Sequence, residues 1–140
     1  MLVRLMYASR AVPGVDQEEL LAILKKSKVN NHKSGVTGAL CFSEGIFIQV
    51  IEGGRDAVNK LYNLIATDPR HGDVVLLNYD EIEERRFSGW SMGQVNMQRM
   101  NPALLLKYSE CARLDPFAVS GRVSLALFEE LVATAAIMGQ

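Results

Sequence analysis

The sequence has few of the residues that reinforce a small fold by covalent or metal bonds. Its 140 residues include two cysteines and two histidines. Cys41 and Cys111 are far apart and fit no metal-ligand spacing, so we expect two reduced thiols. His32 and His71 do not form a pair suited to a metal. A chain of this length can bury a core without such bonds.

Long apolar runs and an excess of one charge are also missing. No stretch approaches the roughly 18 apolar residues of a membrane span. The first residues lack the basic and apolar regions of a signal peptide. The formal net charge of −1 gives no general attraction to nucleic acid or to anionic membranes. We therefore expect a soluble cytoplasmic protein with neither of these partners.

The signatures of common enzyme classes are absent from the sequence. There is no P-loop and no glycine fingerprint for dinucleotides. No serine or cysteine has an obvious histidine and carboxylate partner. Gly53-Gly54 precedes a predicted helix and is only a weak signal for anion binding. These absences predict a protein that is not an enzyme and binds no metal.

Hydrophobic periodicity predicts an α+β fold. Alternation predicts strands over residues 2–8, 36–42, 46–52, 73–79 and 90–97. A capping box at Asp16 and Glu19 begins a first helix, and apolar spacing from Val58 to Ile65 predicts a second. The order β-α-β-β-α-β-β indicates a ferredoxin-like sandwich with both helices on one sheet face.

The opposite sheet face also needs a cover. Met6, Ile48 and Val50 make it apolar. Helices are predicted over residues 102–108 and 122–138. The second of them, which carries Leu125, Leu127, Phe128, Leu131 and Val132, is the nearest candidate cover, and a partner chain is the alternative. We expect one domain over residues 1–98 and a helical extension over residues 99–140 that packs on the sheet or mediates oligomerisation.

Several polar side chains lie on elements that are otherwise typical of a core. Gln49 interrupts an apolar strand, and burying its amide costs about 1–3 kcal/mol unless both ends are bonded. Tyr7 lies in the first strand. One stripe of the first helix contains Leu20, Leu24, Ser27 and Asn31. We expect these polar groups to meet in a slot between the sheet and the two helices.

The predicted slot suits a flat heteroaromatic ligand with donors and acceptors on its edge. Arg70 would lie at its open end. Each residue also has a structural explanation: Asn30 and Asn31 fit a helix C-cap, and Trp90 and Met92 fit core packing on one face of the fifth strand. The residue chemistry by itself leaves the ligand unnamed.

Five segments of the sequence stand out together by their order and spacing. They are Leu5-Met6-Tyr7-Ala8-Ser9, Asn30-Asn31 with Ser34-Gly35-Val36-Thr37-Gly38, Phe47-Ile48-Gln49-Val50-Ile51-Glu52-Gly53, Asp68-Pro69-Arg70-His71 and Arg86-Phe87-Ser88-Gly89-Trp90-Ser91-Met92. In this order and spacing they resemble the BLUF family of flavin-binding blue-light sensors. The resemblance covers about residues 2–97, and the remaining tail resembles that of short BLUF proteins without an enzymatic output domain.

The resemblance implies a noncovalent flavin between the two helices: FAD, with FMN or riboflavin as alternatives. Gln49 would bridge the Tyr7 hydroxyl and the flavin N5/O4 edge, and Asn31 would bond the ring's carbonyl and N3 edge. The implied binding residues are Tyr7, Ser27, Asn30, Asn31, Gln49, Arg70 and His71.

The resemblance also implies a photocycle. Light would drive an electron and then a proton from Tyr7 to the flavin, after which the Gln49 amide would rotate or tautomerise. Trp90 and Met92 would relay the change to a homo-oligomer or a separate signalling protein. The sequence leaves open which of the two faces the flavin.

Two other functions are compatible with the fold class. One is a ferredoxin-like binding module whose slot is empty or holds another ligand. The other is an acylphosphatase-like hydrolase, which would need an anion-binding loop after the first strand. Arg10 lies in that loop, but residues 11–14 do not resemble an anion nest.

Overall fold

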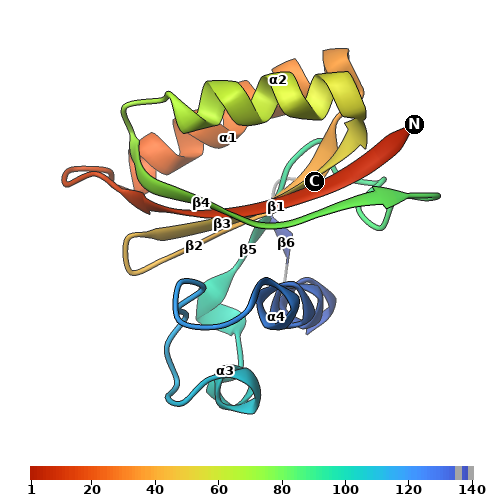
Figure 1. Cartoon of the computed structure of the whole chain (residues 1–140). Helices are drawn as coiled ribbons and strands as arrows, with labels where there is room; N and C mark the ends of the chain where they lie inside the picture. The colour runs from red at the N-terminus through yellow and green to blue at the C-terminus, as the bar shows by residue number, and fades with distance from the viewer. Residues whose placement is uncertain (135–136, 139–140) are drawn as a thin grey trace.

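A mixed sheet separates two layers of helices in the computed structural model of the protein (Figure 1). The structure describes residues 1–134 and 137–138, without the side chains of Gln17, Leu20, Leu24, Gln98, Ile137 and Met138. Leu20 and Leu24, predicted on the stripe of the first helix, therefore have side chains outside the described part. No helix of the described residues is both long and apolar enough to span a membrane.

The helices and strands follow the predicted order, with additions after the fifth strand. They are β1 (Leu2–Ala11), α1 (Gln17–Ser34), β2 (Thr37–Ser43), β3 (Ile46–Gly54), α2 (Arg55–Ala66), β4 (His71–Ile82), β5 (Gly93–Val95), a 3₁₀ turn (Met97–Arg99), α3 (Pro102–Tyr108), α4 (Gly121–Thr134) and β6 (Ile137–Met138).

The sheet order among the described residues is β4-β1-β3-β2-β5-β6. β1 pairs antiparallel with both β3 and β4, whereas β2 and β5 run parallel. Figure 1 shows α1 and α2 on one side of the sheet and α3 and α4 on the other. The ferredoxin-like α+β class is therefore confirmed.

The local signals at the ends of α1 act as the sequence predicts. The Asp16 side chain caps the helix by accepting a bond of 2.9 Å from the Glu19 backbone N–H. Gly35 ends the helix with φ 72°, in the left-handed region that glycine adopts at little cost. These two residues set where α1 begins and ends.

Each face of the sheet has its own apolar core. Under α1 and α2, Leu5, Phe47 and Ile51 pack with Val58 of α2. On the second face, Met6, Ile48 and Val50 pack in one cluster with side chains of α4, which are Leu127, Phe128 and Leu131. α4 of the same chain therefore covers the apolar second face of the sheet. The predicted domain boundary at residue 98 stays a prediction.

The predicted fifth strand over residues 90–97 is wrong in extent and in the faces it assigns. Only Gly93–Val95 is a strand, because residues 83–92 form turns and bends. Alternation does not apply there, so Trp90 and Met92 do not share a face. Met92 packs in the core under α1 and α2, whereas Trp90 packs on the second face against Phe87.

The predicted helix over residues 122–138 is also wrong at its C-terminal end. α4 ends at Thr134, and residues 135–136 lie outside the described part. Ile137–Met138 instead forms β6, which pairs antiparallel with β5. That pairing occupies backbone groups at the open side of β5. Local periodicity could not predict β6, because its pairing with β5 joins segments that are far apart along the chain.

Candidate functional site

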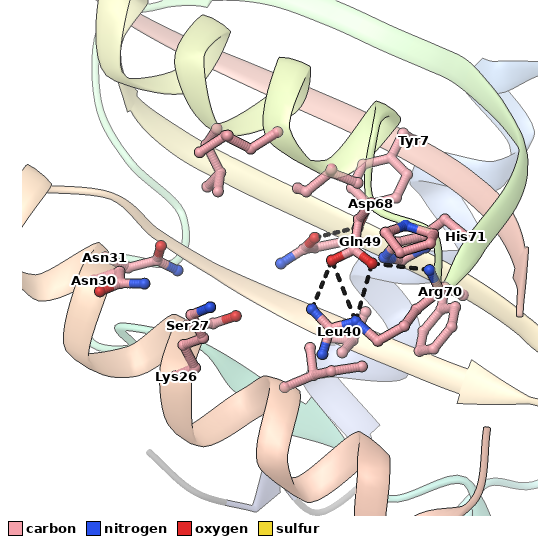
Figure 2. A pocket seen from close by; sticks show the side chains of 16 residues that line it. Tyr7, Lys26, Ser27, Asn30, Asn31, Leu40, Gln49, Asp68, Arg70 and His71 are labelled. Carbon is pink, nitrogen blue, oxygen red and sulfur yellow. Dashed lines mark hydrogen bonds and ion pairs between the residues drawn. The ribbon is translucent and has the colours of Figure 1, made fainter.

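A cavity of about 300 Å³ lies between the sheet and the two helices α1 and α2 (Figure 2). Its volume is at the lower end of the roughly 300–1,000 Å³ typical of ligand sites. The cavity brings together every residue that the sequence predicted to bind a ligand. They are Tyr7, Ser27, Asn30, Asn31, Gln49, Arg70 and His71. Their roles in binding stay predictions.

Tyr7 and Gln49 form the polar floor of the cavity. They are directly opposite each other on β1 and β3, and their exposed fractions are 1% and 6%. The Tyr7 Oη donates a hydrogen bond to the Gln49 Oε1. Burial, with a smaller contribution from the charge of Asp68, raises the pKa of Tyr7. The phenol therefore keeps its proton and acts as a donor.

The other end of the Gln49 amide also has a partner. Its Nε2 donates to the Met92 Sδ at 3.2 Å. A thioether is a weak acceptor and cannot donate, so this contact matches the donor end of the amide. Both ends of Gln49 are therefore bonded, which offsets the cost of burying it. Met92, rather than Trp90, is the neighbour of the glutamine.

α1 supplies the polar wall opposite Tyr7 and Gln49. Figure 2 shows Ser27, Asn30 and Asn31 along this helix, across the cavity from the glutamine. Asn31 is buried, and its Nδ2 donates to the Ser91 carbonyl oxygen at 3.0 Å. This bond fixes the end of α1 to the segment that carries Met92.

Arg70 is held at the edge of the cavity by Asp68, a residue that the sequence reasoning missed. Arg70 Nη2 donates to Asp68 Oδ2 at 2.6 Å, and the Arg70 backbone N–H donates to Oδ1 at 2.8 Å. These bonds lower the pKa of Asp68 to about 2. An acidic residue two positions before an arginine was the available signal. Arg70 therefore has a fixed direction and a carboxylate partner.

His71 lies beside the Tyr7 ring, at a centroid distance of 6.2 Å in an edge-on arrangement. Its Nδ1 is 2.6 Å from the hydroxyl of Ser9, which is buried on β1. Desolvation lowers the pKa of His71, so the imidazole is neutral near pH 7. Ser9 belongs to one of the five segments that resemble the family, but no role was predicted for it.

Arg10 does not support the hydrolase alternative. Its guanidinium lies 4.3 Å from the centre of the Phe117 ring and 3.7 Å from the carboxylate of Asp73. An arginine engaged in this way is turned toward the C-terminal segment and an acidic side chain. Arg10 is also part of β1 itself, so the prediction that it lies in the loop after the first strand is wrong.

Comparison with known families decides the identity of the domain. A match to the family of sensors of blue-light using FAD, BLUF, covers residues 2–93. The chain belongs to the BLUF family. It carries a flavin-binding, blue-light-sensing BLUF domain.

BLUF relatives among curated proteins are much longer than this chain. The photoactivated adenylate cyclase subunit beta of Euglena longa is 36% identical over 92 residues, which is 65% of this chain and 11% of that protein. The subunit alpha of Euglena gracilis is 37% identical over 84 residues, 8% of its length. The chain thus matches about a tenth of the length of these cyclase subunits.

Several solved BLUF structures share the whole fold. The photo-activated state of BlsA has a TM-score of 0.83 at 28% identity and covers 94% of this chain and 95% of its own. The dark state of BlrB has a TM-score of 0.80 at 32% identity with the same coverage. BlrP1 of Klebsiella pneumoniae, solved with FMN and cyclic diGMP, has a TM-score of 0.70 at 29% identity, covering 97% of this chain and 31% of its own.

The lining of the cavity fits a flavin ring. Apolar walls from α1 and α2 match the faces of a planar aromatic system, and the amide and phenol groups on the sheet match its polar edge. The lining residues that the sequence reasoning did not assign are Ile23, Lys26, Leu40, Phe47, Leu64, Asp68 and Pro69. Most of them are apolar and look like ordinary core positions in a sequence.

Proposed function

We propose that this protein is a blue-light receptor that binds FAD noncovalently between α1 and α2 and responds through Tyr7 and Gln49. The observation that supports this most is the buried hydrogen bond from Tyr7 to Gln49 at the floor of a cavity between the sheet and the two helices. FMN and riboflavin are the alternative cofactors, since the isoalloxazine ring is common to all three.

When bound, a flavin supplies absorption of blue light and an excited state that accepts an electron. Tyr7 is the proposed electron donor, because its phenol is buried, protonated and hydrogen-bonded. Removal of that electron would make the phenol strongly acidic, and its proton would then move along the hydrogen bond onto the Gln49 Oε1, where the amide would hold it. Return of both to Tyr7 restores the phenol.

The Gln49 amide is the proposed bistable element. If it rotates by half a turn, Nε2 faces the Tyr7 Oη and Oε1 faces the Met92 Sδ. A thioether cannot donate to that oxygen. In the rotated state the Gln49 Oε1 therefore needs another hydrogen-bond donor, or the amide must change to its other tautomer. The side chains of the protein alone therefore favour the present orientation. An occupied cavity and light shift the balance, as in other local switches.

The proposed output is a change of contacts rather than a catalysed reaction. Residues 2–93 are accounted for by the sensor domain. We propose that Met92 relays the change from Gln49, that Trp90 belongs to the same connecting segment on the other face, and that a second copy or a separate signalling protein receives the signal.

The test is an absorption spectrum of the purified protein before and after blue light. We expect bound flavin, identified as FAD by extraction and chromatography, and a red shift of its band that reverses in the dark. A protein that stays colourless after incubation with FAD, FMN and riboflavin would contradict the proposal and favour the binding module.

A further inference from the structure

A buried carboxylate lies on the sheet face opposite the cavity. Glu52 is three residues after Gln49 on β3, and its exposed fraction is 0%. Its Oε2 accepts from Arg4 Nε at 2.9 Å. Its Oε1 accepts from the backbone N–H groups of Phe87 at 2.8 Å and Arg86 at 3.0 Å.

The bonds of Glu52 hold the backbone of residues 86–87 in a set position on the sheet. A buried ion pair is costly to desolvate, and apolar replacements of such pairs are often neutral or stabilising. Stability alone therefore gives little reason for Glu52 and Arg4. The two backbone donors come from Arg86 and Phe87, in a connection of turns and bends whose own backbone pairing is sparse. The carboxylate ties that connection to β3.

The tied connection touches α4 at one end. The Phe87 ring meets the Phe128 ring edge-on, with centroids 6.3 Å apart. The Arg86 guanidinium forms an ion pair with Glu129. Both partners are on α4, and Phe128 belongs to the apolar cluster on the second face of the sheet.

The same connection reaches the cavity at its other end. The Trp90 carbonyl accepts from the Gly38 N–H at 3.0 Å, the Ser91 carbonyl accepts from Asn31 at 3.0 Å, and Met92 accepts from Gln49 at 3.2 Å. Residues 86–92 thus span from the cavity floor on one face of the sheet to α4 on the other.

We propose that Glu52 is a positioning residue that makes residues 86–92 a rigid link between Gln49 and α4. A change in the Gln49 bonds that displaces Met92 is then passed to Phe128 and Glu129, because the bonds to Glu52 keep residues 86–87 ordered against α4 and the link does not lose the displacement by local unfolding. The inference rests on the proposed light response of Gln49.

The test compares Glu52→Gln with Glu81→Gln by hydrogen exchange and absorption in dark and light. Glutamine removes the charge and turns an NH₂ group toward donors. Glu81 is a matched control, because its ion pair with Arg55 is exposed. We expect at least about a tenfold loss of amide protection at residues 86–87 in Glu52→Gln. The red shift stays, while the light–dark difference in exchange over residues 121–134 falls to less than half.

If Glu52 only stabilised the fold, its loss would not keep the red shift while reducing the light–dark difference in exchange at α4. If Glu52→Gln keeps the light–dark difference at α4, or keeps the protection at residues 86–87, the proposal is wrong. If the variant does not fold because Arg4 loses its partner, Arg4→Met/Glu52→Met removes both charges at similar volume and must show the same separation. If the wild type shows no red shift, the proposed function fails, and the dark protection at residues 86–87 still decides whether Glu52 holds the link.

Discussion

On one face of the sheet Gln49 bonds a phenol and a thioether, and three residues later, on the other face, Glu52 bonds a guanidinium and two backbone amides. The bonds of Gln49 are neutral, and one is to a weak acceptor. Those of Glu52 are charge-assisted and roughly twice as strong. The hydrogen bonds on the cavity face of the sheet are therefore suited to exchange, and those on the second face are suited to keeping the same partners.

Tyr7→Phe should have the largest effect and is confined to the cavity side. It removes the donor hydroxyl with little change in volume, so we expect retained flavin and complete loss of the red shift. Light-minus-dark absorbance measures this. Tyr62→Phe is the matched control, because its ring lies 6.0 Å from that of Tyr7 and it is only partly buried. A normal shift in Tyr7→Phe would remove Tyr7 from the mechanism.

Gln49→Leu tests whether the exchangeable amide is required. Leucine of similar size loses both bonds and leaves the Tyr7 hydroxyl without an acceptor, at a cost of about 1–3 kcal/mol. We expect bound flavin with no red shift, measured by the same spectra. Gln94→Leu is the control, since Gln94 is a buried glutamine on β5. If Gln49→Leu shows the same light-induced red shift as the wild type, the proposed mechanism is wrong.

Gly121→Ala should disturb the packing of α4 on the second face of the sheet and leave the cavity intact. A Cβ at this position would lie 1.9 Å from the Leu77 carbonyl oxygen, so the start of α4 must move away from β4. We expect a loss of about 1–3 kcal/mol in the free energy of unfolding, measured by urea denaturation, with flavin content unchanged.

Gly89→Ala provides the comparison for that variant. A Cβ there meets nothing within 4 Å, so the free energy of unfolding should change by less than about 0.5 kcal/mol. Equal effects at the two glycines would show that the close approach of α4 to β4 does not contribute to stability.

Asp68→Asn should have a smaller effect than Gly121→Ala, and its effect should depend on pH. The pKa of Asp68 is lowered from 3.8 to about 2 in the fold, so its stabilisation is present above the unfolded pKa and disappears as the pH falls from about 4 to 2. Because solvent screens this pair, we expect a cost of about 1 kcal/mol at pH 7.

Urea midpoints at pH 7 and at pH 2.5 measure that difference. Asp73→Asn is the control, because its 3.7 Å pair with Arg10 is exposed and should contribute little at either pH. A deficit of Asp68→Asn that is as large at pH 2.5 as at pH 7 would show that the carboxylate does not act through its charge.

Local sequence patterns determined much of this protein. Alternation along β1 and β3 put Tyr7 and Gln49 on the face under the helices, and the spacing along α1 put Ser27 and Asn31 on the side toward them. A capping box and a glycine set the ends of α1. These features depend on neighbours a few residues apart, which a sequence displays directly.

Only the tertiary structure decided which residues meet across long separations. Alternation could not place Trp90 and Met92, because the segment that carries them forms turns and bends held by bonds to Gly38 and Asn31. The partners of Glu52 lie 34, 35 and 48 residues away along the chain. Such contacts form when two layers close on a sheet, so the sequence determined the glutamine that can exchange partners, and the fold decided that Met92 would be one of them.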